Sequence, residues 1–266
     1  PQLGAHREAA AHLRTALDAI AAGAPAEPSV LAQCYESWSY EAALVKITDE
    51  TLTARKQAIT LWQQLGNKEK VALNCRWASR LHWYRGESAR SQEFANRAIV
   101  ELADAAPCAE QAWGYSVVSQ HAMLNGNTRK AIESGERAIA LAEQVGATEV
   151  RVHALNSIGS AQAFSNDLSG LKKLEESLAL ALQHGFHEQA ARVYTNMASY
   201  GVSCRDLQLA RHFANDGLEF DRRHDLDSWT YYLEGISAQI ELLSSQFSAA
   251  ESIALDWKTF RMAHVA

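Results

Sequence analysis

Small and apolar residues recur along the chain at the spacing of an amphipathic helix. After Asn127 they stand at Ala131, Ile132, Gly135, Ala138, Ile139, Ala142 and Val145. Residues three and four apart share one face of an α-helix, so this pattern predicts a helix with one buried face over about 128–145.

The same helix pattern returns about every 40 residues. One position of the pattern carries a small residue in every repeat. These residues are Ala58, Ala98 and Ala138, followed by Ser177 and Gly217, with Ala16 and Ser252 as outer members. Small residues are required where two helices approach closely, so we expect Ala58, Ala98 and Ala138 to be buried at helix contacts. Gly66, Gly146 and Gly185 follow three of these positions by eight residues, where a helix commonly ends in the left-handed conformation.

Turn residues keep the same period. Gly86-Glu87, Gly126-Asn127, Asn166-Asp167 and Arg205-Asp206 each precede the small position by about 12 residues. Asn127, Asp167 and Asp206 stand where N-cap residues belong. Each unit is therefore a helix (A), a turn, a second helix (B) and a short link.

Seven B helices and six A helices predict an all-α fold, a tetratricopeptide-like (TPR-like) α-solenoid of helix-turn-helix hairpins. Such units bury their apolar faces by stacking, which forms a continuous core and a concave groove. We expect one domain over residues 1–266 with about 6.5 repeats, cut from a larger protein. Apolar ends around Leu13, Leu17, Ile253 and Leu255 would then allow a homo-oligomer.

Composition supports this picture. The 266 residues include only four prolines, and Pro107 alone interrupts the chain after Pro28. The formal charge of -6 leaves no basic excess for nucleic-acid binding. The four cysteines form no closely spaced pair, as expected of free, buried thiols, and no stretch is apolar enough to span a membrane. The expected location is cytoplasmic.

We find no set of residues that supports catalysis, so the sequence predicts no enzyme, cofactor or metal site in this chain. The P-loop, HExxH and GxSxG patterns are all missing. His184 and His187 are the closest histidine pair, and the carboxylates of Asp225 and Asp227 fall at a helix link. Histidines and carboxylates at such links are ordinarily exposed to solvent, and we expect this of both pairs.

Polar residues follow the A helices in two registers. The first register reads Glu36, Arg76, Ser116, Asn156 and Asn196, and the second, one turn later, reads Tyr40, Arg80, Gln120, Ser160 and Tyr200. Trp113, His153, Trp83 and Tyr84 are candidates to flank them. Two interpretations stay open: the ladders join neighbouring helices or meet water, or they contact a ligand or partner in the groove. We expect Glu36 to offset part of the positive charge of Arg76.

The candidate binding residues are accordingly Arg76, Arg80, Trp113, Ser116, Gln120, His153, Asn156, Ser160, Asn196 and Tyr200. Neutral hydrogen-bonding groups beside aromatic rings suit a sugar-like or peptide ligand better than a polyanion.

Five segments resemble one family. They are residues 4–13 (GAHREAAAHL), 135–143 (GERAIALAE), 153–161 (HALNSIGSA), 191–198 (ARVYTNMA) and 225–229 (DLDSW). They are similar to the helical-repeat sensor region of large ATP-dependent LuxR-type transcriptional regulators, which have a maltose-activator-like architecture. The resemblance implies an ATPase module before this region and a helix-turn-helix after it.

By this resemblance, the chain senses a small-molecule effector or a protein partner in its groove and passes the signal to the ATPase and DNA-binding modules. The alternative is a stand-alone TPR scaffold that holds a peptide or protein and has no link to transcription. The domain content of the intact protein separates the two.

Overall fold

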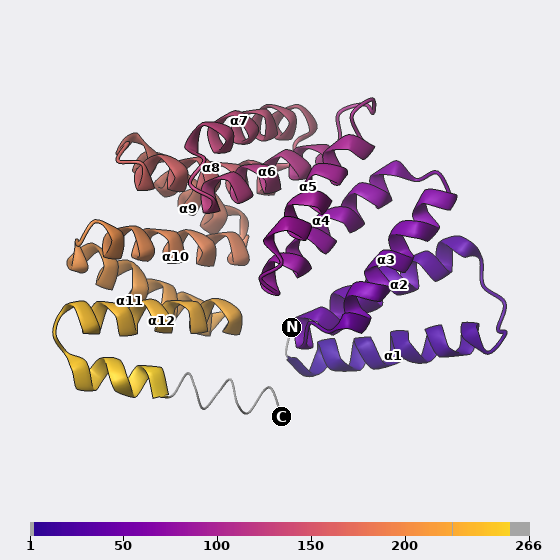
Figure 1. The fold of residues 1–266 in the computed structure, drawn as a ribbon, viewed down its shortest axis with the longest axis horizontal. Helices are drawn as coiled ribbons and strands as arrows, with labels where there is room; N and C mark the ends of the chain where they lie inside the picture. Colours follow the sequence, from indigo (N-terminus) through magenta and orange to yellow (C-terminus); the bar gives the residue numbers. More distant parts are fainter. Residues whose placement is uncertain (1–2, 225, 256–266) are drawn as a thin grey trace. The chain divides into compact units, whose positions relative to one another are not determined.

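A computed structural model describes residues 3–224 and 226–255, and nearly all of them are helical. Figure 1 shows the helices in chain order, from α1 in indigo to α12 in orange. Their bounds are α1 Leu3–Ala21, α2 Pro28–Val45, α3 Asp49–Gln64, α4 Lys68–Tyr84, α5 Ser88–Glu101, α6 Ala109–Leu124, α7 Thr128–Val145, α8 Thr148–Phe164, α9 Ser169–His184, α10 His187–Ser203, α11 Leu207–Arg223 and α12 Asp227–Leu243. A thirteenth helical stretch covers residues 247–255.

The predicted alternation of A and B helices is confirmed. The even-numbered helices are the A helices, and the odd-numbered helices together with residues 247–255 are the B helices. No strand occurs within the described ranges. The fold is thus an all-α solenoid of helical hairpins.

The turns and caps follow the repeat closely. Gly66, Gly146 and Gly185 have φ of 69°, 69° and 68°, as predicted for helix ends. Asn127 and Asp206 cap their helices by accepting hydrogen bonds from the amides of Lys130 and Leu209.

One predicted cap is displaced. Asp167 accepts from the amide of Ser169, but the N-cap residue of α9 is Leu168, so this helix begins one residue later than the repeat suggests.

The small positions are at the helix contacts. Ala58, Ala98 and Ala138 are at most 1% exposed. At Gly217 an added Cβ would lie 2.6 Å from Leu233 Cδ1, so only glycine fits there without a shift. The outer members differ, since Ala16 is half-buried and Ser252 is exposed.

The contacts divide the chain into two compact units. Unit 1 holds the described residues of 1–121 and 136–150, and unit 2 holds those of 122–135 and 151–255. In unit 1, consecutive helices from α1 to α5 pack on each other; in unit 2, the same is true from α9 to α12, and α10 also packs on α12. One domain over 1–266 stays a prediction.

The two ends of the chain differ in how far their apolar residues are exposed, and the homo-oligomer stays a prediction. Leu17 is buried against Trp38 and Ala54 in unit 1, so it offers no apolar face to a second copy. At the other end Leu255 is 54% exposed. Of the four free thiols only Cys75 is buried, and Cys204 is exposed, which corrects the expectation that all are buried. Among the helices described, none is long and apolar enough to cross a membrane.

Candidate binding surface on the A helices

Arg76 on α4 is the centre of the polar ladder in unit 1. Its Nε and Nη2 donate to the two carboxylate oxygens of Glu110 on α6, at 2.9 and 3.0 Å. The two side chains are only 15% and 12% exposed. A bidentate pair of this kind fixes both charge and orientation. Arg76 is therefore neutralised by Glu110.

Glu36, the residue expected to offset Arg76, has other partners. It is buried and accepts from Lys70 Nζ at 2.8 Å, from Asn74 Nδ2 at 2.7 Å and from Trp62 Nε1 at 3.0 Å. The expectation was wrong because a helical repeat shows the register of a side chain but not which neighbour it turns toward.

Aromatic rings and guanidinium groups alternate over α4 and α6. The Arg76 guanidinium lies 4.9 Å from the ring centre of Trp113 and 5.5 Å from that of Trp77. Arg80 lies 5.2 Å from Trp77 and 5.6 Å from Tyr84. Such contacts hold flexible arginines flat against the rings.

Tyr40 on α2 completes this cluster, with its ring edge-on to Trp77 at 5.0 Å. Tyr40 and Tyr84 are 37% and 47% exposed. We call Tyr40, Arg76, Trp77, Arg80, Tyr84 and Trp113 the arginine–aromatic face. Trp77 was not among the predicted residues, although it lies directly between the ladder positions 76 and 80.

The other predicted residues of unit 1 are less accessible. Ser116 is fully buried and Gln120 is half-buried, both on α6. The structure thus brings Arg76, Arg80 and Trp113 together in one cluster and leaves Ser116 buried.

The ladder in unit 2 bonds within itself. Asn196 Nδ2 on α10 donates to Asn156 Oδ1 on α8 at 2.6 Å and lies 3.0 Å from Ser160 Oγ. Asn156 and Ser160 are 1% and 0% exposed. These contacts favour a role in joining α8 to α10, and ligand binding here stays a prediction.

The remaining candidates of unit 2 are also buried. Tyr200 is 9% exposed and lies edge-on to Phe164 at 5.9 Å, and burial raises the pKa of its hydroxyl. His153 is 7% exposed, and its backbone oxygen accepts from Arg192 Nη1 at 3.1 Å.

Two buried arginines, which were not among the predicted binding residues, hydrogen-bond across the helix contacts. Arg192 is 5% exposed and also donates to Ser157 Oγ at 2.9 Å. In unit 1 Arg55 is 1% exposed and donates to Asn74 and Ser39, and burial lowers its pKa to about 10. Charged side chains are usually exposed, so nothing in the sequence predicts that these two arginines are buried.

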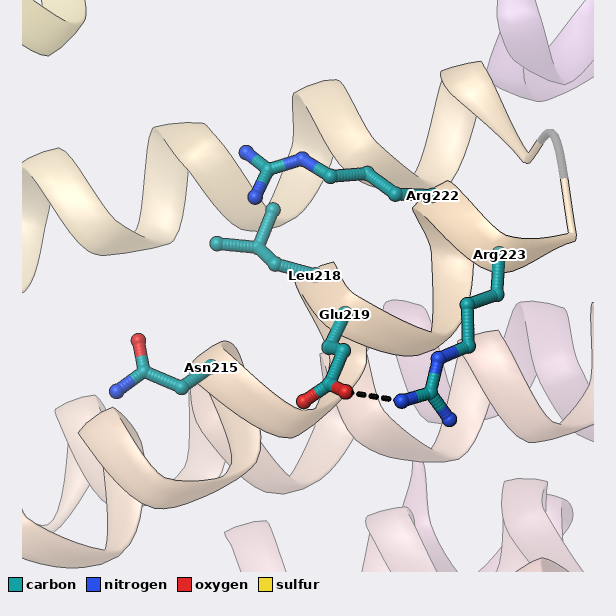
Figure 2. A pocket seen from close by; sticks show the side chains of 5 residues that line it. All are labelled: Asn215, Leu218, Glu219, Arg222 and Arg223. Atoms are coloured by element: carbon teal, nitrogen blue, oxygen red, sulfur yellow. Dashed lines mark hydrogen bonds and ion pairs between the residues drawn. The ribbon is translucent and has the colours of Figure 1, made fainter.

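A pocket of about 380 Å³ lies on the surface of α11 (Figure 2). Its lining comprises Asn215, Leu218, Glu219, Arg222 and Arg223, none of which the sequence singled out. Glu219 pairs with Arg223, and Arg222 lies 3.4 Å from Glu234 on α12. Its charges are therefore balanced, and the pocket favours no particular ligand class.

The histidine pair seen in the sequence does not form a site. His184 stacks on Phe186 at 5.5 Å, whereas His187 lies against His224. Asp225 lies outside the described residues. In the part of the chain that the structure covers, no three His, Cys, Asp or Glu side chains are grouped to hold a metal ion.

Comparisons support the fold. No family model and no curated protein sequence matches the chain. RapI in its apo form is similar in structure, with a TM-score of 0.60 and 12% identity over 87% of this chain and 83% of that one. TPR-like repeats of a Podosopora anserina kinesin light chain give a TM-score of 0.51 and 12% identity, over 76% of this chain and 99% of that one.

A signal transduction ATPase with numerous domains (STAND), which carries a tetratricopeptide repeat sensor, also matches. This protein from Pyrococcus horikoshii has a TM-score of 0.56 and 12% identity, over 87% of this chain and 37% of that one. At these identities the likeness shows the fold alone. The chain is a TPR-like helical-repeat solenoid, a fold typical of protein-interaction domains.

Proposed function

We propose that this chain is the signal-sensing, protein-interaction region of a LuxR-type ATP-dependent transcriptional regulator. It binds an effector or partner on its A helices. The observation that supports this proposal is the arginine–aromatic face of unit 1, which gathers aromatic rings from three successive A helices around two arginines and exposes the rings of Tyr40 and Tyr84.

The face has the features of a recognition surface. Trp, Tyr and Arg are the residues that contribute most to binding at protein interfaces, and rigid side chains lose little entropy when a partner docks. The pairing of Arg76 with Glu110 and its stacking on Trp113 hold it in one orientation before binding. A partner therefore meets a preformed surface.

The likeness to the STAND protein adds to the regulator hypothesis. In that protein a TPR array is the sensor attached to an ATPase. The second candidate, a stand-alone scaffold that binds a peptide or protein, is favoured by the same face and needs no attached module.

The domain content of the intact gene product tests the regulator hypothesis. We expect a P-loop ATPase before this region and a helix-turn-helix after it. An intact product without either module would rule out the regulator and leave the scaffold.

A crosslinking experiment tests the face itself. A photoreactive phenylalanine replaces Tyr84 in the intact protein, and its adducts in cells are identified by mass spectrometry. The matched control replaces Val100, which is 71% exposed on α5, a B helix. We expect an adduct at position 84 alone, lost when Trp113→Ala is added. Identical adducts at both positions would contradict the proposed surface.

A further inference from the structure

Three successive A–B turns of unit 2 lie next to one another. They join α6 to α7, α8 to α9 and α10 to α11. The hydroxyl groups of Thr128, after the first turn, and Ser165, in the second, are hydrogen-bonded. Phe164, at the start of the second turn, lies edge-on to Tyr200 on the last turn of α10. The three turns therefore form one continuous edge of unit 2.

Apolar side chains are exposed along this edge. Leu124 and Phe164, the last residues of α6 and α8, are 47% and 44% exposed, and Leu168 is 63% exposed. Leu124 and Phe164 stand 40 residues apart, so they occupy equivalent places in successive repeats. Apolar side chains on adjacent turns are typical of an interaction site, whereas isolated ones need no explanation.

The same edge carries a positive charge. Residues 124–130, 164–173 and 203–209 contain five basic and two acidic residues, although the whole chain has a formal charge of -6. Lys130, Lys172 and Arg205 are exposed, and within the described residues none of the three forms an ion pair with a carboxylate. Arg129 is the exception, because it lies 3.9 Å from Glu133.

The two acids of the edge cap helices. Asp167 accepts a hydrogen bond from the amide of Ser169 at 3.0 Å, and Asp206 accepts one from the amide of Leu209 at 2.9 Å. Amides at the positive end of a helix offset the charge of a capping carboxylate. The exposed cations therefore dominate the charge of this edge.

Two other A–B turns lack this charge. After α4, Arg85 pairs with Asp49 and Glu87. The turn after α12, residues 244–246, contains no charged residue. The positive charge is therefore a property of the three turns in unit 2 and not of the repeat in general.

Two residues of the edge break local rules of helix structure. Leu168 is the N-cap residue of α9 and makes no side-chain cap, at a position where Ser, Asp and Asn are preferred. Arg205 has a φ of 65°, in a turn position that Gly86 and Gly126 occupy in other repeats. Both side chains are exposed, so neither gains packing within the fold. Residues that break a local rule without a structural gain are expected at functional sites.

We propose that these turns form a docking edge for an acidic peptide segment that carries apolar side chains. The basic–apolar edge consists of Leu124, Lys130, Phe164, Leu168, Lys172 and Arg205. Carboxylates of the peptide face the three cations, and its apolar side chains cover the three exposed apolar residues. The edge belongs to unit 2, so it is a second surface beside the arginine–aromatic face of unit 1 and does not depend on it.

A peptide fits this edge better than an anionic membrane does. A membrane surface presents a dense layer of negative head groups, which would also meet Asp167 and Asp206. A peptide can place its acids opposite the cations alone. The edge also lacks the tryptophans and tyrosines that are enriched at membrane interfaces, since residues 124–130, 164–173 and 203–209 contain neither.

Selection from a displayed library of random peptides tests the proposed chemistry. The full chain is the bait, and peptides that also bind the variant Lys172→Glu with Arg205→Glu are removed, because they recognise another surface. We expect the remaining peptides to be rich in Asp and Glu together with Leu and Phe. One of them is synthesised, and its Kd, measured by fluorescence anisotropy, should weaken as salt is raised.

Two variants separate binding from stability. Leu168→Ser introduces a preferred N-cap residue, and Arg205→Gly removes a strained conformation, so each should keep or raise the Tm measured by calorimetry. Each should also weaken the Kd of the selected peptide by about fivefold to tenfold, because it removes an apolar contact or a charge. Lys68→Glu, at an exposed lysine of α4 in unit 1, is the matched control for Lys172→Glu and should leave the Kd unchanged.

Three results would overturn the basic–apolar edge. No acidic peptide is enriched, or the selected peptide binds the parent chain and both single variants equally, or Lys68→Glu weakens binding as much as Lys172→Glu. Vesicles of phosphatidylserine and phosphatidylcholine are tested in parallel. If they bind the chain and lose binding in Leu168→Ser and Arg205→Gly, while no peptide is enriched, the edge binds a membrane and the peptide proposal is wrong.

Discussion

At the scale of single residues, the same polar ladder behaves differently in the two units. In unit 1 its arginines lie among aromatic rings, two of which, Tyr40 and Tyr84, are exposed. In unit 2 its two amides bond to each other, with Asn156 buried and Asn196 half-buried. Both parts have the same 40-residue spacing, so spacing alone does not distinguish a binding surface from a helix contact.

The amide pair provides a direct test. Asn156→Ala with Asn196→Ala removes the bonds that join α8 to α10 and leaves Ser160 buried with fewer partners. Each such bond contributes about 0.5–1.5 kcal/mol, so we expect a loss of about 1–3 kcal/mol and a Tm several degrees lower by calorimetry. Gln120→Ala, at a half-buried ladder position, is the control. An unchanged Tm would instead leave these amides available for a ligand.

His121 gives a prediction for acid. It is 6% exposed, its Nε2 lies 3.2 Å from Ser91 Oγ, and burial lowers its pKa to about 4. An unfolded histidine titrates near 6.5, so between these values the unfolded chain binds more protons. Stability is then complete above about pH 6.5 and decreases toward pH 4.

His121→Gln checks this assignment. As the pH falls through this range, the free energy of unfolding of the variant should decrease by about 1 kcal/mol less per pH unit than that of the parent chain. Urea unfolding at several pH values measures both. Equal pH slopes in the two proteins would show that other groups cause the acid sensitivity.

At the scale of helices and turns, the sequence predicted most of what the structure shows. Left-handed turns at Gly86, Gly126, Asn166 and Arg205 have φ of 75°, 69°, 64° and 65°. These features are local, because a cap or a turn depends on residues within one turn of helix. The Asp167 cap was displaced by one residue, the usual size of error for a helix boundary.

Contacts between distant residues were the part that could not be predicted. Arg55 bonds to Asn74 and Arg192 to His153, and each pair combines residues far apart in sequence. A repeat period aligns positions, but the rotamer of a long side chain decides which of several neighbours it meets. Of the residues in the arginine–aromatic face, Arg76, Arg80 and Trp113 were among the predicted binding residues, and Trp77 was not.

Close packing between helices predicts a cost for added volume. Ala98 on α5 is 1% exposed within the core that includes Ala58 and Ala72. Ala98→Leu should destabilise the chain by about 1–3 kcal/mol, as measured by thermal unfolding. Val100→Leu on the same helix, where the side chain is 71% exposed, is the control and should change Tm little. Equal effects would contradict the repeat alignment.

At the scale of the whole chain, contacts are made mainly between successive helices within each unit. The stability of such a solenoid is approximately a sum over repeats and the interfaces between neighbours. This architecture explains why the period is visible in the sequence, because each repeat packs on its neighbours with the same face. It also explains why the function is not visible in the sequence, because a few substitutions on one face change what a repeat contacts.

A destabilising substitution should therefore affect mainly the repeat that carries it and the neighbouring repeats. In unit 2, an added Cβ at Gly201 would lie 2.6 Å from the backbone nitrogen of Ala210, so Gly201→Ala should push α10 away from α11. We expect hydrogen exchange to rise mainly in α10 and α11, with little change in α2–α4. Ala98→Leu should produce the reverse pattern. A uniform rise along the chain in both variants would show that all the repeats unfold as one cooperative structure, which is the behaviour that nearest-neighbour contacts argue against.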